Sequence, residues 1–183
     1  MKQKITLVLL LFFLNTFAQQ ARVVYSVSRG NISFNSAARL ELIKANSQSL
    51  RGFIDASNGT FAFAINMNTF EGFNVALQRE HFNEKYMEST LYPSASFKGK
   101  IIEDVDLSKD GTYHVRVKGI MNIHGVEQER IIPATVVVSN GMLNITSKFS
   151  VLLKDHNIKV PKVVNEKIAT EVFVEVTADM IRK

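Results

Sequence analysis

A strict alternation of large and small side chains between residues 60 and 67 limits most strongly what this chain can fold into. It places Phe61, Phe63, Ile65 and Met67 on one face of an extended segment, with alanine and asparagine between them. Successive side chains in a strand point to opposite sides, so a period of two is typical of a strand with one buried face. The segment predicts a β-strand that lies against an apolar interior.

The same period recurs along the chain between turn signals. It predicts strands over residues 22–28, 31–37, 49–56, 60–67, 95–103, 112–123, 131–139, 142–152 and 171–178. Short glycine-containing steps separate several of them, at residues 29–31, 58–59, 109–111 and 140–141. Asn-Gly and Asp-Gly steps favour tight hairpins, so most neighbouring strands should be antiparallel. About nine strands exceed what one open twisted sheet holds easily, which predicts an all-β sandwich or closed barrel.

Residues 74–89 interrupt the strand pattern and have helical character. Val75, Phe82 and Tyr86 lie at i, i+7 and i+11, close to one helical stripe. A short helix of this kind either covers the mouth of a barrel or caps a core without touching a ligand, and both interpretations stand. The connection over residues 154–167 is a second candidate for the rim.

Four predicted inward faces contain one very small residue among large ones, namely Gly52, Gly99, Gly119 and Ser147. Glycine in a strand often marks a bend or a close approach of two backbones. Alternatively, missing side chains leave room for a guest, because native interiors hold few voids larger than a water molecule. The first interpretation predicts a closed core, and the second predicts a barrel with an internal cavity that holds a ligand.

The first eighteen residues look like a secretory signal peptide rather than part of the fold. Lys2 and Lys4 precede an apolar stretch over residues 5–14, and small residues stand at the −3 and −1 positions of a cleavage site after Ala18. The apolar stretch is shorter than the ~20 residues of a transmembrane helix. We therefore expect one domain over residues 19–183, without stable membrane insertion, in the periplasm or secreted.

Composition excludes several classes of function. The chain contains no cysteine, which removes disulfides and thiolate sites. The formal charge of +5 falls to +3 without the two leader lysines, too little and too scattered to indicate a nucleic-acid partner. The four histidines have no local ligand spacing, so we expect no metal and no cofactor. For His124, in a turn after a strand, a bond to backbone carbonyls is the default expectation.

Three segments resemble the YceI-like family of secreted bacterial proteins. They are residues 71–99, containing Tyr92-Pro93 and Phe97-Lys98-Gly99; residues 117–126, ending in Ile-His-Gly-Val; and residues 149–158. They occur in the family's order and span essentially all of residues 19–183. The chain departs from the family pattern in two places. It has Asn66, Asn68 and Glu71 where many members carry a serine-rich strand and an Arg-Asp pair, and His156-Asn157 where an aromatic residue and glycine are usual.

The resemblance implies an extended, lipocalin-like antiparallel β-barrel of about eight strands with a short inserted helix. It also implies an isoprenoid or other long-chain lipid in the lumen, bound for transport or storage. Independently of the resemblance, we expect a monomer or a homodimer, because two-fold dimers are the commonest oligomers. No catalytic residue is expected. Candidate lipid contacts are taken from the inward faces and the helix: Phe61, Phe63, Ile65, Met67, Phe82, Tyr86, Phe97, Gly99, Val117, Gly119, Met121, Ser147, Phe149 and Val174.

Two other functions remain open at this point. A lipid-acting enzyme would use His81 or His124 with a nearby carboxylate as an acid or base, which requires hydrogen-bond reach to the transferred proton. A surface interaction module would instead have a filled core and an exposed apolar patch.

Overall fold

The computed structural model describes residues 22–183, so the predicted signal peptide lies outside the described residues. Nine strands dominate the fold: β1 (Val24–Ala37), β2 (Leu42–Ser47), β3 (Arg51–Asp55), β4 (Thr60–Asn66), β5 (Ser94–Ile101), β6 (Gly111–Ile123), β7 (Val126–Ser139), β8 (Met142–Leu152) and β9 (Glu171–Arg182). The helical segments are short: η1 (Met67–Thr69), α1 (Ala76–His81), the π-helical turn η2 (Phe82–Tyr86), η3 (Leu153–His156) and η4 (Lys162–Val164).

Every strand pairing is antiparallel, and the pairing of β1 with β9 closes the sheet. Both β2 and β3 pair with β1 in one unbroken register, with Ile32 opposite Ser47 and Ser26 opposite Phe53. β2 and β3 therefore occupy one place in the sheet, like a single strand with a gap. The nine strands thus form a closed barrel with eight strand positions. The predicted all-β barrel of about eight strands is confirmed.

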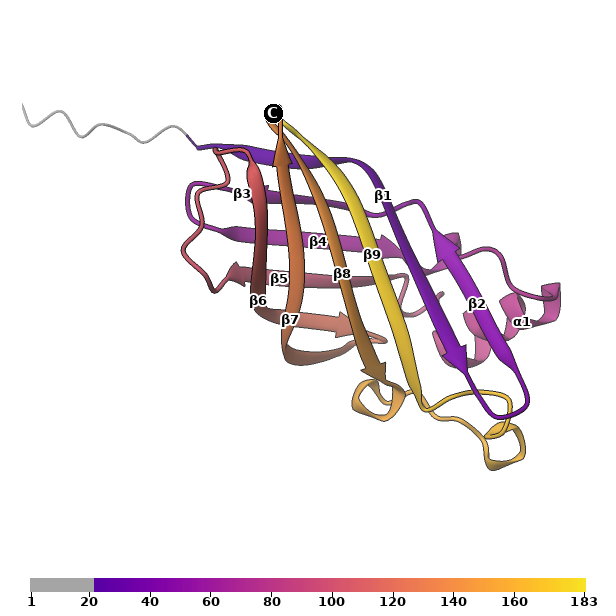
Figure 1. Ribbon diagram of the computed structural model, residues 1–183. Helices are drawn as coiled ribbons and strands as arrows, with labels where there is room; N and C mark the ends of the chain where they lie inside the picture. Colours follow the sequence, from indigo (N-terminus) through magenta and orange to yellow (C-terminus); the bar gives the residue numbers. More distant parts are fainter. Residues whose placement is uncertain (1–21) are drawn as a thin grey trace, which may run out of the picture.

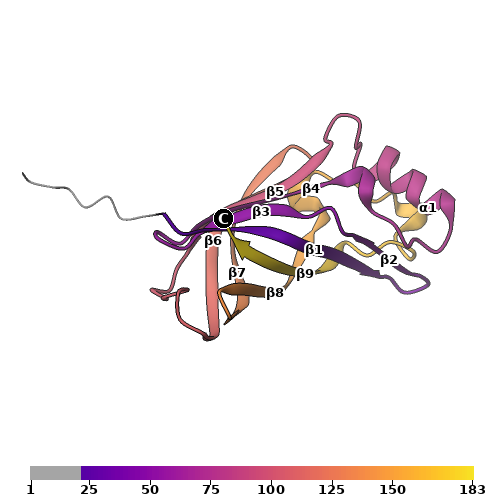
Figure 2. The same cartoon turned by 90° about the horizontal axis from the view of Figure 1, so that it is seen from above.

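The barrel is flattened, with two groups of strands that cross (Figure 1). In this view β3, β4 and β5 run across the molecule, while β8, β9 and the second half of β1 run steeply down it. β6 changes direction part-way along and joins the two groups. Seen from above, α1 and the connection after β8 lie at the same end, away from the C-terminus (Figure 2).

The predicted turn at residues 29–31 is wrong, because β1 continues through it with only a bulge between Val27 and Arg29. At Gly30 an added Cβ would lie 2.9 Å from the Leu50 Cβ. Glycine is therefore needed here because the Leu50 side chain packs against the backbone, and not because the chain reverses direction. The actual reversal comes after Ala37, and β2 was not predicted at all.

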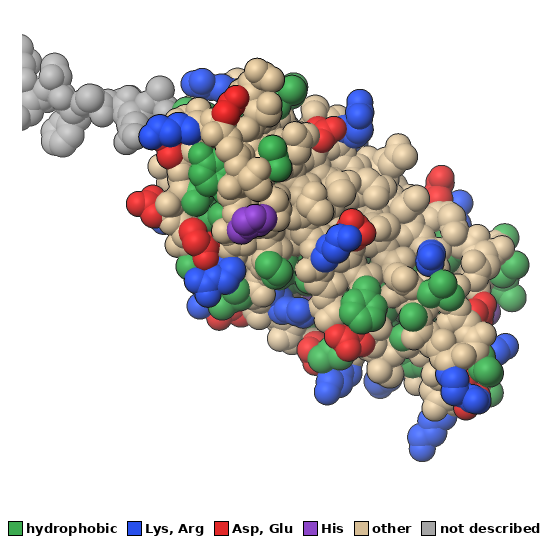
Figure 3. Space-filling view, in the orientation of Figure 1, with side chains coloured by type: hydrophobic (Ala, Val, Ile, Leu, Met, Phe, Trp, Pro, Cys, Tyr) green, Lys and Arg blue, Asp and Glu red, His purple; other side chains and the backbone are tan. Residues whose placement is uncertain are grey.

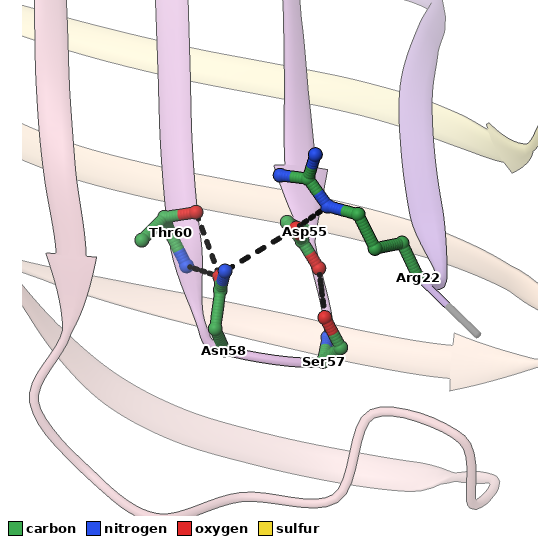
Figure 4. A network of polar contacts seen from close by, with 5 residues as sticks. All are labelled: Arg22, Asp55, Ser57, Asn58 and Thr60. Carbon is green, nitrogen blue, oxygen red and sulfur yellow. Dashed lines mark hydrogen bonds and ion pairs between the residues drawn. The ribbon is translucent and has the colours of Figure 1, made fainter. Parts of the chain in front are cut away.

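The two Asn-Gly hairpins are confirmed. Gly59, Asn140 and Gly141 have φ values of 72°, 51° and 72°, the left-handed region that tight hairpins require. At the first hairpin, the buried carboxylate of Asp55 accepts hydrogen bonds from the Ser57 hydroxyl and backbone N–H and from Asn58 Nδ2 at 3.3 Å (Figure 4). Arg22 Nε donates to the same carboxylate at 2.8 Å and ties the start of the barrel to this turn.

Candidate ligand-binding cavity

The barrel encloses an apolar cavity of about 570 Å³. All nine strands contribute lining side chains, and most of these are aliphatic or aromatic. Protein interiors normally contain few voids larger than one water molecule, so a space of this size is not a packing defect. It falls within the ~300–1,000 Å³ range of small-molecule sites. A surface module with a filled core is therefore excluded.

Twelve of the fourteen predicted contact residues line this cavity: Phe61, Phe63, Ile65, Met67, Phe82, Tyr86, Phe97, Val117, Met121, Ser147, Phe149 and Val174. They come from β4, η1, η2, β5, β6, β8 and β9. The strand alternation thus placed the inward faces correctly. Ser147 is held by a bond from its Oγ to the Pro133 carbonyl at 2.7 Å.

Gly99 and Gly119 do not line the cavity, contrary to expectation. A Cβ added to Gly99 would lie 2.1 Å from the Lys118 carbonyl oxygen, and one on Gly119 would lie 2.3 Å from the Lys98 oxygen. The space beside both glycines is filled by neighbouring backbone. For this pair the close-approach interpretation is right, and the idea that they leave room for a ligand is wrong.

Gly52 also leaves no open space. An added Cβ would lie 2.3 Å from Cδ1 of Phe63, its cross-strand partner. The Phe63 ring covers the glycine and also lines the cavity. The cavity volume therefore comes from the barrel's curvature and diameter rather than from missing side chains at these positions.

Four phenylalanines form a cluster at the α1 end of the cavity. Phe34 of β1 stacks on Phe82 of η2 with centroids 5.4 Å apart and planes at 17°. Phe70 and Phe73, between η1 and α1, pack on the same two rings with centroid distances of 5.2 to 5.9 Å. Sequence reasoning missed Phe70 and Phe73 as lining residues because they lie in an irregular segment without periodicity.

Three segments meet around the opening of the cavity. Asn74 Nδ2, just before α1, donates to the Leu42 carbonyl at 3.0 Å, and Gln78 of α1 bonds to the Glu41 carboxylate. The Leu40 N–H donates to the Glu166 carbonyl at 2.8 Å, which joins the β1–β2 turn to the segment after η4. Val75 and Leu77 line the cavity yet are 56% and 55% exposed, so the cavity opens here.

Polar side chains are few in the lining. Its charged and amide side chains, Glu41, Gln78 and Lys167, stand at this opening with His81, whereas the serines of the lining lie on strands. Burial raises the pKa of the Tyr86 phenol, which keeps it neutral and able to donate a hydrogen bond. Within residues 22–183, no hydrogen bond or ion pair joins His81 to a carboxylate. The same residues contain no group of three or more His, Asp or Glu side chains arranged to hold a metal.

His124 is tied to the backbone outside the cavity, as expected. Its Nδ1 donates to the His156 carbonyl at 3.1 Å, and its Nε2 lies 2.7 Å from Glu88 Oε2. The Tyr92 ring packs against it at 4.5 Å. It is not a cavity-lining residue, so it has no access to a molecule bound there. This geometry argues against His124 as an acid or base acting on a lipid.

His156 and Asn157 hold the turn after β8. His156 is fully buried, and its Nδ1 donates to the Val126 carbonyl at 3.2 Å. Burial lowers its pKa below the ordinary value of 6.5. Asn157 has φ 57°, a left-handed conformation that asparagine tolerates better than most residues, which explains how it can stand where glycine is usual.

Several solved structures resemble this barrel. A polyisoprenoid-binding domain from Saccharophagus degradans, implicated in plant cell wall breakdown, superposes with a TM-score of 0.74 at 17% identity, covering 87% of this chain and 98% of that one. BcnA of Burkholderia cenocepacia gives 0.69 at 14% identity, covering 82% and 95%. A YceI protein from Campylobacter jejuni gives 0.54 at 11% identity, covering 71% and 77%. At these identities the likeness shows the fold alone.

A search of curated proteins found no match. None of the helices in residues 22–183 is long and apolar enough to cross a membrane. The family comparison is decisive, because the model of the YceI-like domain matches residues 17–180, which is nearly the whole chain. Together with the closed eight-position barrel, this match shows that the chain belongs to the YceI-like family.

Proposed function

We propose that this protein binds one long-chain apolar lipid of the polyisoprenoid type inside the barrel and carries or stores it unchanged. The observation that carries the proposal is the cavity of about 570 Å³ with an almost entirely apolar lining. The Saccharophagus degradans neighbour, a polyisoprenoid-binding domain, supports the same ligand class. Sites with this composition select for hydrocarbon, because an unpaired polar group would lose its hydrogen bonds to water on entering.

Burial of a hydrocarbon tail supplies enough free energy for useful affinity. Each buried methylene is worth ~0.8 kcal/mol. A tail of about ten carbons thus gains roughly 8 kcal/mol before the cost of ordering the ligand is subtracted. The aromatic cluster of Phe34, Phe70, Phe73 and Phe82 offers rings against which the planar double bonds of an isoprenoid can pack.

The polar groups at the opening suggest where a headgroup stays. Glu41, Gln78 and His81 lie at the end of the cavity where Val75 and Leu77 are exposed. A lipid would enter tail first and leave its headgroup among these side chains, with water within reach. We further propose that the leader over residues 1–18 is removed and that the protein works in the periplasm or outside the cell.

Native mass spectrometry tests the proposal directly. Protein purified from its own kind of bacterial host should carry a co-purifying lipid, recovered unchanged after long incubation. Repeated recovery of empty protein, together with no uptake of quinones, polyprenols or fatty amides, would refute the proposal. Recovery of a chemically altered lipid would favour an enzyme instead.

A further inference from the structure

We propose that the open end of the barrel docks reversibly on the surface of an anionic phospholipid bilayer. The docking surface, here called the mouth rim, consists of residues 37–44, 75–81 and 159–168. Five large apolar side chains on it are exposed: Leu40 by 59%, Leu42 by 45%, Val75 by 56%, Leu77 by 55% and Val163 by 89%. Exposed apolar groups that cluster in this way mark interaction surfaces.

Hydrogen bonds hold the three rim segments together, so these side chains share one end of the molecule. Gln78 donates to the Glu41 carboxylate, which joins the first two segments. The Leu40 N–H donates to the Glu166 carbonyl, which joins the first and third. Arg39 and Glu166 form an ion pair at 2.6 Å between the same two segments. The rim surrounds the opening of the cavity, since Val75 and Leu77 belong to both.

The net charge of the protein is concentrated on the mouth rim. Its three segments contain six Lys or Arg and three Asp or Glu, a balance of +3, which equals the whole formal charge of residues 19–183. The remainder of that region is therefore neutral on balance. Figure 3 shows Lys and Arg side chains beside apolar ones at this end of the molecule. Basic residues within a Debye length of an anionic bilayer are attracted to its surface.

The mouth rim has exposed apolar side chains, neighbouring Lys and Arg side chains and a cavity opening wide enough for a lipid. These three features together match the surface of a lipid bilayer better than that of a folded protein partner. Apolar side chains can enter the boundary between headgroups and acyl chains, while Lys and Arg reach outward to the phosphates. The passage of a lipid between bilayer and cavity rests on the proposed function, but the docking itself does not. Docking can therefore be measured without any ligand in the barrel.

The experiment is co-sedimentation with vesicles of equal parts phosphatidylcholine and phosphatidylglycerol, compared with vesicles of phosphatidylcholine alone. The wild-type protein should bind the mixed vesicles more tightly, and salt should weaken this binding because it screens the charges. The test variant is Leu40→Asp with Val163→Asp. Neither residue lines the cavity, so uptake of a fluorescent polyprenol from detergent solution should be unchanged.

The matched control is Met142→Asp with Ile181→Asp. These two residues are 48% and 47% exposed and lie opposite each other on β8 and β9, at the end of the barrel away from the mouth rim. The control therefore gains two negative charges, as the test variant does. The test variant should lose at least about tenfold in vesicle affinity, or ~1.4 kcal/mol, and the control far less.

Three results would overturn the docking proposal. The first is an equal loss in both variants, and the second is equally tight binding of wild-type protein to neutral and mixed vesicles. The third is a dimer in solution that only the test variant dissociates, which would make a second copy the occupant of the rim. Normal docking by a protein that takes up no polyprenol would instead refute the proposed function and leave docking intact.

Discussion

Gly99 and Gly119 face each other across β5 and β6, and each stands where the backbone of the opposite strand excludes any side chain. The two strands approach each other here more closely than a Cβ on either residue would allow. The pair thus shapes the barrel without touching the cavity.

Gly119→Ala should therefore destabilise the protein by ~1–3 kcal/mol, as overpacking typically does, and leave the lipid affinity of folded protein unchanged. Thermal melting and a fluorescent-lipid titration measure the two effects. Lys118→Ala, an exposed change on the same strand, is the control and should stay within about 0.5 kcal/mol of wild type. An unchanged melting temperature with weaker lipid binding would show that the glycine does border the ligand.

Ala134→Phe should fill part of the cavity. Ala134 lines the cavity opposite Val115 and Ser147, and a phenyl ring there occupies space that a lipid tail would use. We expect at least a tenfold loss of lipid affinity, ~1.4 kcal/mol, with stability preserved or raised. Ile131→Phe adds bulk on the exposed face of the same strand and should leave the affinity unchanged. Equal affinity in both variants would mean that the tail lies elsewhere.

Asp55→Asn should lower the melting temperature most at neutral pH. Bonds from Ser57 and Arg22 hold the pKa of Asp55 below its ordinary value of 3.8, against the opposing effect of burial. A carboxylate with a lowered folded pKa stabilises the fold above the ordinary value, and this contribution is lost as pH falls through the folded pKa. The wild-type and variant melting temperatures should converge below about pH 4. The control is Asp104→Asn at an exposed position, where the substitution should change stability by about 0.5 kcal/mol or less.

His156→Phe should remove a loss of stability on acidification. Because burial lowers the folded pKa of His156, the unfolded chain binds a proton first, and stability falls as pH drops below about 6.5. The variant does not lose stability in this way on acidification. It does lose the hydrogen bond to the Val126 carbonyl, which is worth about 1 kcal/mol of folding stability. It should be slightly less stable at neutral pH and gain relative to wild type in mild acid. The control is His114→Phe at an exposed position, where the substitution should change stability by about 0.5 kcal/mol or less.

The local sequence pattern predicted the inward-facing residues correctly in strands that have one face toward the barrel interior. The alternation around Phe61 and Phe63 identified lining residues correctly, because a period of two leaves only one choice of inward face. The Asn58-Gly59 and Asn140-Gly141 steps located hairpins correctly, since few other residues accept their backbone angles. The same local logic failed at Gly30, where glycine meets Leu50 rather than turning the chain.

The amino-acid sequence alone predicted the all-β class, the inward faces, two hairpins and the membership of the family. The role of each small residue and the place where the cavity opens became visible in the folded barrel. Gly99 and Gly119 lie twenty residues apart, and nothing local reveals that their backbones touch. The mouth rim likewise combines segments from three distant parts of the chain. Such contacts depend on strand curvature and closure between β1 and β9, which a one-dimensional pattern of side chains does not encode.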